Sequence, residues 1–276
     1  MSPETINDRL AVCSWSLQPE SADQLIETMG QLPVKKIQLA LEPLRNSPDA
    51  WADTGSRLAD AGMEIVSGMF EGVGEDYSTP QRIAETGGVV PDETWPQLWS
   101  NIQQIVPIAK DLGMSFVTFH AGFLPHETSD PTYDKLKSRI VQIADIFADQ
   151  DIEVGFETGQ ETASTLKDFL DDMAKDNIGV NFDPANMILY QMGDPIEALD
   201  VLGPYLKQCH IKDATETKVP GTWGDEVTVG TGQVDWPAFF AALDRASFDG
   251  YLAIEREAGD QRIADIKTAA EFVAGL

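Results

Sequence analysis

Four apolar segments in the second half of the chain each carry, at or near their end, a side chain that can bind a divalent cation. The segments read VGFETG, NFDPAN, CHIKDA and LAIERE, and they supply Glu157, Asp183, His210 and Glu255. Three carboxylates and one imidazole form a hard, mostly oxygen ligand set that suits Mn²⁺, Mg²⁺ or Co²⁺ and also admits Zn²⁺. We therefore predict one bound divalent cation, provided that the fold brings the four side chains together.

Each of these residues alone has an ordinary structural explanation. A carboxylate at a strand end is usually solvated or caps a helix, and a single buried histidine usually just satisfies a hydrogen bond. Three acids gathered on neighbouring strands are different, because without a cation they would repel one another and raise one another's pKa. The recurrence of the pattern, rather than any one residue, indicates a metal site.

The elements that must position these residues follow from an alternation of short apolar runs with longer amphipathic ones. The runs with strand character cover residues 10–17, 36–43, 64–71, 116–122, 152–159, 178–184, 206–214 and 251–257. Helical patterns, with apolar residues three and four apart, cover residues 21–32, 94–113, 133–150, 162–177 and 260–276. Ser21, Asp49 and Ser164 are the candidate helix starts.

Eight strands that alternate with helices predict an α/β fold, and a (β/α)8 TIM barrel made by a single domain over residues 1–276 fits best. A doubly wound open sheet is the rival, but it would usually show a glycine-rich phosphate loop after an early strand, and CSWSLQPE is not one. In a barrel, the last four strands are consecutive neighbours, so the four ligands can converge at one side of the mouth. Two long connections, 71–94 and 215–236, leave the same C-terminal ends and are expected to be lids or binding loops.

Other side chains at the predicted strand ends are candidate substrate contacts. His120 would sit beside Glu157, and Lys212 has the parity of His210 and should point inward, although it could equally neutralise the acids. Arg256 has the opposite parity to Glu255, so a packing or loop role competes with substrate contact.

Three further candidates lie elsewhere around the mouth. Glu71 and Trp15 are predicted substrate contacts from the opposite strands, with Trp15 as an apolar floor for a sugar ring or as simple packing. Trp223, in the loop 215–236, would shield the site or anchor that loop.

The motifs FETG, NFDPAN, HIKDA, VGTGQVDW and ERE resemble those of the xylose isomerase-like superfamily of sugar isomerases and epimerases, and the resemblance covers nearly the whole chain. In ketose 3-epimerases of this superfamily, a Glu–Asp–His–Glu tetrad binds one divalent metal, and its two glutamates act as acid and base on opposite faces of the substrate. Matched by motif, the resemblance implies metal ligands at Glu157, Asp183, His210 and Glu255. It also implies a catalytic pair of Glu157 and Glu255.

The implied reaction is proton abstraction next to the carbonyl of a ketose, keto-sugar or keto-polyol. The cation would hold the ketone oxygen and stabilise an enediolate while one carboxylate removes the proton. Returning the proton gives an epimer or an isomer, whereas loss of a β-hydroxyl gives dehydration. We expect a metal-dependent isomerase or epimerase. The alternatives are a metal-dependent dehydratase of the inosose dehydratase type, which HIKD also resembles, and a non-catalytic sugar-binding barrel.

Two positions depart from the ketose 3-epimerase pattern. Those enzymes usually carry a histidine three residues after the metal-binding aspartate, where this chain has Asn186, and a second glutamate where it has Ala163. The departures argue against a simple free-ketohexose epimerase, and they leave Asn186 as the expected substrate contact. Endonuclease IV-type chemistry is disfavoured, because that site needs several additional histidines and this chain has three in all.

Composition limits the partners. With 46 acidic and 19 basic residues, the formal net charge is −27, which opposes binding to a phosphate backbone. We expect a small sugar-like substrate, no nucleic acid, no membrane and a possible homo-oligomer. Cys13 and Cys209 lie in apolar runs and are expected to be reduced and buried. The N-terminal sequence lacks a signal-peptide pattern, so we expect a cytoplasmic protein.

Overall fold

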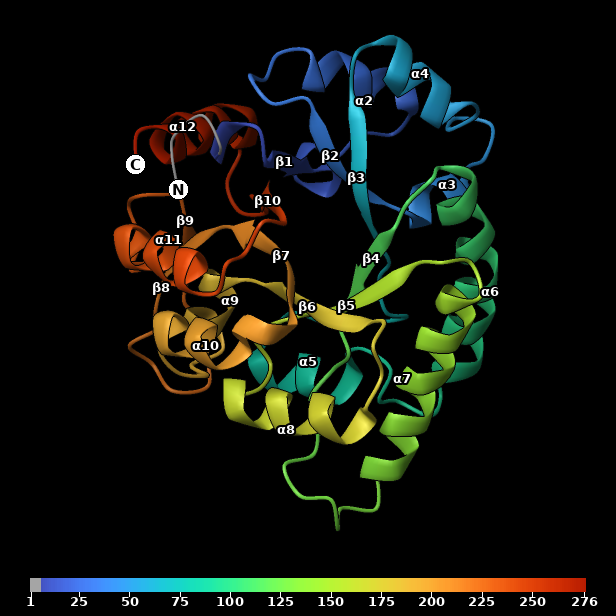
Figure 1. Cartoon of the computed structure of the whole chain (residues 1–276), viewed down its shortest axis with the longest axis vertical. Coiled ribbons are helices and arrows are strands. Elements are labelled where there is room, and N and C mark those ends of the chain that lie inside the picture. Colours follow the sequence, from blue (N-terminus) through green and yellow to red (C-terminus); the bar gives the residue numbers. More distant parts are fainter. Residues whose placement is uncertain (1–5) are drawn as a thin grey trace.

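The computed structural model describes residues 6–276, in which eight parallel strands close into a barrel surrounded by helices (Figure 1). Around the barrel the order is β1, β2, β3, β4, β5, β6, β7 and β10, and β10 pairs with β1. The predicted (β/α)8 TIM barrel is therefore confirmed, and the open-sheet alternative is excluded. The four strands that carry the predicted ligands, β5, β6, β7 and β10, are consecutive neighbours.

The strands match the predicted runs but end two to four residues earlier, because the chain leaves the ladder as soon as it reaches the mouth. Residues 14–17, for example, form a 3-10 turn, and residues 42–46 form a short helix. The barrel strands are β1 (Leu10–Cys13), β2 (Lys36–Ala40), β3 (Glu64–Met69), β4 (Phe116–Phe119), β5 (Glu153–Glu157), β6 (Ile178–Phe182), β7 (Leu206–Ile211) and β10 (Tyr251–Ile254).

The helices form the outer layer, with α6 and α7 along one side and α10, α11 and α12 on the other (Figure 1). They are α2 (Ala22–Met29), α3 (Glu42–Asn46), α4 (Thr54–Asp60), α5 (Pro80–Thr86), α6 (Trp95–Asp111), α7 (Tyr133–Ala148), α8 (Ala163–Met173), α9 (Pro184–Leu189), α10 (Pro195–Leu202), α11 (Trp236–Arg245) and α12 (Arg262–Ala274). Two 3-10 turns connect strands and helices: η1 (Ser14–Leu17) lies between β1 and α2, and η2 (Gly203–Tyr205) lies between α10 and β7. None of the helices in residues 6–276 combines the length and the apolar character that a membrane crossing requires.

Helix starts were predicted with mixed success. The Ser21 hydroxyl accepts the backbone N–H of Gln24 and caps α2, as expected. The starts at Asp49 and Ser164 are wrong: α4 begins after Asp53, and the hydroxyl of Thr162 caps α8 two residues before Ser164. Thr162 is the N-cap of α8 because its extended backbone conformation lets its hydroxyl reach the N–H of Thr165.

The core has two unlike parts. Between the strands and the helices it is apolar and aromatic; the rings of Phe70 and Phe119, for example, stack with their centroids 5.0 Å apart. Inside the barrel it is partly polar, and the fully buried side chains there include Gln38, Thr118 and Asn181. Buried polar groups are stable only when they are hydrogen-bonded, so this interior must form a connected network.

The loop 215–236 is more ordered than predicted. Residues 213 and 214, expected as the end of the seventh barrel strand, instead belong to β8 (Asp213–Thr215), which pairs antiparallel with β9 (Asp225–Val227). The other long connection, 71–94, contains helix α5. Both loops therefore carry secondary structure of their own beside the barrel mouth.

Asp213 organises the return of this loop toward α11. Its Oδ1 accepts the N–H groups of Ala214 and Val234, at 2.9 and 3.2 Å. Its Oδ2 accepts those of Gly230 and Gly232, at 2.9 and 3.0 Å, and the indole N–H at the start of α11 at 3.1 Å. A Cβ at Gly232 would lie 2.1 Å from Oδ1, so the motif VGTGQVDW needs a glycine there. One carboxylate thus satisfies five donors.

The first testable expectation concerns this carboxylate. Asp213→Asn turns one acceptor oxygen into an NH₂ group that faces N–H donors, so the free energy of unfolding should fall by about 2–3 kcal/mol. The measurement is urea unfolding. Asp235→Asn is the matched control, because Asp235 caps α11 through the N–H of Ala238 and asparagine caps equally well. Equal losses in both variants would contradict the role assigned to Asp213.

Candidate active site

The four predicted metal ligands lie where neighbouring strands end. Glu157 is the last residue of β5, His210 is the last but one of β7, and Asp183 and Glu255 directly follow β6 and β10. All four are buried, and each offers a ligand atom within 4.8 Å of the other three. The Nδ1 atom of His210 lies 3.4 Å from Asp183 Oδ2 and from Glu255 Oε2, and 3.5 Å from Glu157 Oε1.

Three polar atoms of the cluster residues have no hydrogen-bond partner within residues 6–276. Glu157 Oε2, Asp183 Oδ2 and His210 Nδ1 are buried and have no hydrogen-bond partner. Leaving buried polar atoms unpaired costs about 1–3 kcal/mol each, and more for charged groups. A single divalent cation would remove this cost at Asp183 Oδ2 and His210 Nδ1 and would offset the repulsion between the acids. The donor set of three carboxylates and one imidazole therefore fits a divalent cation.

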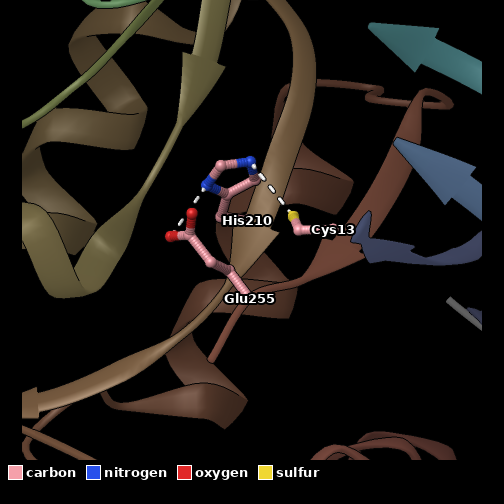
Figure 2. Close-up of side chains that lie close together, drawn as sticks. All are labelled: Cys13, His210 and Glu255. Atoms are coloured by element: carbon pink, nitrogen blue, oxygen red, sulfur yellow. Dashed lines mark hydrogen bonds and ion pairs between the residues drawn. The ribbon is translucent and has the colours of Figure 1, made fainter. Parts of the chain in front are cut away.

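His210 stands between the carboxylate cluster and the barrel interior. Figure 2 shows one ring nitrogen facing Glu255 and the other facing Cys13, whose Sγ lies 3.7 Å from Nε2. Burial raises the pKa of the Cys13 thiol to about 12, which keeps the thiol protonated in the absence of a cation. Both Cys13 and Cys209 are buried and unpaired, as predicted.

The far side of the imidazole is held by buried amides. Gln38 Oε1 lies 2.9 Å from His210 Nε2, and the amide of Asn181 approaches the same nitrogen at 2.9 Å. Gln38 donates its own NH₂ group to Thr118 Oγ1 at 2.8 Å, which turns its oxygen toward the ring. Gln208 continues the network by donating to Asn181 Oδ1 at 3.2 Å. A cation at Nδ1 requires the tautomer with a proton on Nε2, and in that tautomer Gln38 Oε1 is the acceptor for Nε2–H.

The two glutamates have different surroundings. Asn186 donates its amide to Glu157 Oε1 at 2.8 Å, while Oε2 faces His120 Nε2 at 3.8 Å. Burial favours a raised pKa for Glu157, but the imidazoles of His120 and His210 hold it below its ordinary value.

Both oxygens of Glu255 have donors. The indole N–H of Trp15 donates to Oε1 at 2.6 Å, and Lys212 Nζ donates to Oε2 at 2.7 Å. Although burial opposes it, the charges of Lys212 and His210 hold the pKa of Glu255 well below its ordinary value. Glu255 is thus the more firmly ionised of the pair.

A cavity of about 850 Å³ opens above the cluster. Glu157 and Glu255 line it, whereas Asp183 and His210 are not among its lining residues and lie fully buried beside them. The cluster thus divides into two buried ligands and two that also face the space where a substrate would sit. The predicted contacts that line this cavity are Trp15, Glu71, His120, Asn186 and Lys212.

Arg256 is not brought to the cavity with the others. Its guanidinium donates to Glu226 at 2.8 Å and to Asp265 at 3.0 Å, and its backbone N–H donates to Ser16 Oγ. The opposite parity of Arg256 and Glu255 sends the two side chains in different directions. Arg256 instead ties the loop after β10 to β9 and α12.

Several residues of the site were missed by sequence reasoning. Glu42 lines the cavity and follows β2 as Glu71 follows β3, so its place after a strand was an available signal. Gln38 interrupts the apolar run KIQLA, and a lone polar residue at an inward position was a sign of a buried network. Tyr77 and Tyr190 also line the cavity, but they lie outside the predicted strands and gave no comparable signal.

Comparisons with known proteins agree with this architecture. A sequence model of the family described as xylose isomerase-like TIM barrel matches residues 24–276. A crystal structure of a xylose isomerase domain protein from Planctomyces limnophilus is 32% identical, has a TM-score of 0.88, and matches over 97% of this chain and 96% of that one. The Escherichia coli (strain K12) protein YihM is 28% identical over 145 residues, which are 52% of this chain but only 43% of the length of YihM.

Two more distant structures share the fold. One, described as L-ribulose 3-epimerase, is 16% identical with a TM-score of 0.73 over 96% of this chain and 93% of that one. The other is a xylose isomerase-like TIM barrel protein from Mycobacterium smegmatis in complex with magnesium, 17% identical with a TM-score of 0.69 over 100% of this chain and 97% of that one.

The geometry of the cluster predicts a cation-dependent gain in stability. At a concentration 100 times its Kd, Mn²⁺, Mg²⁺ or Co²⁺ should add about 2.7 kcal/mol and raise Tm by roughly 5–10 °C, and a chelator should reverse the effect. Asp183→Asn should remove most of this gain without lowering Tm in the chelator, because it deletes a buried negative charge that lies among like charges and whose Oδ2 has no hydrogen-bond partner. Asp172→Asn, on the surface beside Lys137, is the control. An undiminished cation effect in Asp183→Asn would exclude the assigned ligand set.

The role of Gln38 can be tested separately. Gln38→Met keeps the length of the side chain but removes the acceptor for Nε2–H, so calorimetry should give a 10- to 100-fold weaker Kd for the cation. Gln208→Met removes a buried amide from the same network without touching His210, and its Kd should change far less. Equal losses in the two variants would mean that the network acts only through general stability.

Proposed function

The chain belongs to the xylose isomerase-like TIM barrel family, and on that premise we propose that it is a divalent-cation-dependent isomerase or epimerase of a keto-sugar or keto-polyol. The observation that carries the proposal is the buried cluster of Glu157, Asp183, His210 and Glu255 at the cavity, in which Asp183 Oδ2 and His210 Nδ1 lack hydrogen-bond partners. The shared fold with structures described as an L-ribulose 3-epimerase and as a magnesium complex is consistent with it.

The residues that would hold the cation are the four of the cluster. A divalent cation there would supply Lewis-acid chemistry, polarising the substrate carbonyl and making the neighbouring C–H bond more acidic. Asp183 and His210 serve binding alone in this proposal, because they do not line the cavity.

Glu157 is the proposed base. Its Oε1, held by Asn186 and 3.5 Å from His210 Nδ1, is the oxygen that would face the cation, while Oε2 has no hydrogen-bond partner and can take a proton from the carbon next to the carbonyl. His120, 3.8 Å from that oxygen, can then donate to the newly formed oxyanion or to a substrate hydroxyl.

On the other side, Lys212 is the proposed proton source, and the ionised Glu255 that it contacts would relay the proton. Their 2.7 Å ion pair is buried, and Lys212 also contacts Glu257 Oε2 at 3.0 Å, near the cavity opening. A proton returned from this side to the same carbon gives an epimer, and one returned to the adjacent carbon gives an isomer. Trp15, Asn186 and Glu71 are the proposed contacts that orient the substrate.

The direct test is exchange of the proton next to the carbonyl with solvent. In D₂O with Mn²⁺, Mg²⁺ or Co²⁺, proton NMR on a panel of keto-sugars should show deuterium incorporation at that carbon. Because general acid–base groups contribute about 10²–10⁴-fold, Glu157→Gln and Glu255→Gln should each slow exchange by at least 100-fold.

Glu153→Gln is the control variant, since Glu153 lies at the other end of β5 and pairs with Lys207. The exchange rate of this variant should match that of the unmodified protein. Absence of exchange for every keto-sugar in the cation-loaded protein would reject the enolisation chemistry. Loss of a β-hydroxyl from the product would instead identify a dehydratase.

A further inference from the structure

The cavity is larger than the chemistry at its floor requires. Its volume of about 850 Å³ lies near the top of the roughly 300–1,000 Å³ that small-molecule pockets span. Glu157, Glu255 and Lys212 meet at one part of this space, and the remainder extends past them toward the loops 71–94 and 215–236. A single keto-sugar held at the cluster would leave that outer part unfilled.

Aromatic side chains build the outer part. Tyr77 comes from the loop after β3, Tyr190 follows α9, and Trp223 comes from the loop after β7; together they are the aromatic wall. The rings of Tyr190 and Trp223 meet edge to face with centroids 4.8 Å apart. The indole N–H of Trp223 donates to the backbone oxygen of Tyr77 at 2.8 Å, which joins the two long loops over the cavity.

The aromatic wall is only partly covered by the protein. Tyr190 and Trp223 are half-buried, and Tyr77 is 43% exposed. Large, rigid aromatic side chains that stay partly open beside a polar site offer a contact surface for the C–H face of a ring. Their position places such a ring next to a sugar held at the cluster.

The lining of the cavity is mostly acidic, which disfavours anions. Its acidic lining residues beyond the cluster are Glu42, Glu71, Glu75, Asp225, Glu226 and Glu257. The basic side chains that line it within residues 6–276 are His120 and Lys212, and Lys212 is already paired with Glu255 and Glu257. A phosphate or carboxylate on the substrate would therefore meet repulsion rather than a free cationic partner.

From these observations we propose that the substrate is an uncharged keto-sugar bearing a second ring, a keto-glycoside or keto-disaccharide, whose second ring packs on Tyr77, Tyr190 and Trp223. The inference rests on the proposed function for the keto-sugar end, and it adds a second binding subsite and a selection against anionic substrates. Trp223 is the residue that determines this specificity.

The test compares matched ligands on the full-length, cation-loaded protein by calorimetry. One series is D-fructose, maltulose and D-fructose 6-phosphate; the other is 3-keto-glucose, phenyl 3-keto-glucoside and 3-keto-glucose 6-phosphate. In at least one series, the two-ring compound should bind at least 10-fold more tightly than the single ring, and the phosphate should bind more weakly than either. No binding of a two-ring compound, no preference over the single ring, or tighter binding of the phosphate overturns the proposal.

Variants of Trp223 locate the subsite. Trp223→Ala should reduce the ratio of the single-ring to the two-ring Kd at least 10-fold, and Trp223→Phe should largely restore it. If both variants keep the full ratio, the second ring does not bind at the aromatic wall. Solvent exchange on single-ring substrates without any two-ring preference would leave the proposed function standing while rejecting this inference. A two-ring preference without solvent exchange in either series would reject the proposed function and leave this binding subsite standing.

Discussion

The burial of three carboxylates beside one imidazole is the constraint on which the rest of this structure depends. Glu157, Asp183 and Glu255 are each at most 4% exposed, so water screens their repulsion poorly. Lys212 offsets part of the charge through its ion pair with Glu255 but leaves the free oxygens of Glu157 and Asp183 without a hydrogen-bond partner. A divalent cation beside these carboxylates would offset their repulsion.

The barrel accommodates the buried cluster in two ways, through the position of its strand ends and through its polar interior. Parallel closure brings four strand ends to one side, so each ligand comes from a rigid element rather than from a loop. The polar interior then orients the imidazole, because Gln38 and Asn181 occupy the nitrogen that faces away from the acids. An apolar interior would also fill the barrel, but it would leave the ring without a partner to fix its orientation.

The sequence predicted the features that depend on local pattern. Alternating periodicities revealed the eight strands, and the four side chains of the cluster were visible because each lies at or near the end of an apolar run. Features that depend on distant partners were not visible: Asp213 collects donors up to 23 residues later, and Gln38 meets His210 across 172 residues. Strand ends were overestimated because residues such as Phe70 and Ala121 stay buried after the ladder stops. The roles of the site residues remain proposals.

Asn186 contacts two of the candidate ligands and gives the two glutamates different hydrogen-bonding surroundings. Its backbone N–H donates to Asp183 Oδ1 and its side chain donates to Glu157 Oε1, so one turn of α9 fixes both acids. A Cβ at Gly159 would lie 2.5 Å from that of Asn186, so glycine is what lets the loop after β5 approach so closely. Where ketose 3-epimerases usually carry an ionisable histidine, this neutral amide adds no charge beside Glu157. Glu157 therefore keeps a free oxygen, whereas Lys212 and Trp15 occupy both oxygens of Glu255, and the site is chemically asymmetric before any substrate binds.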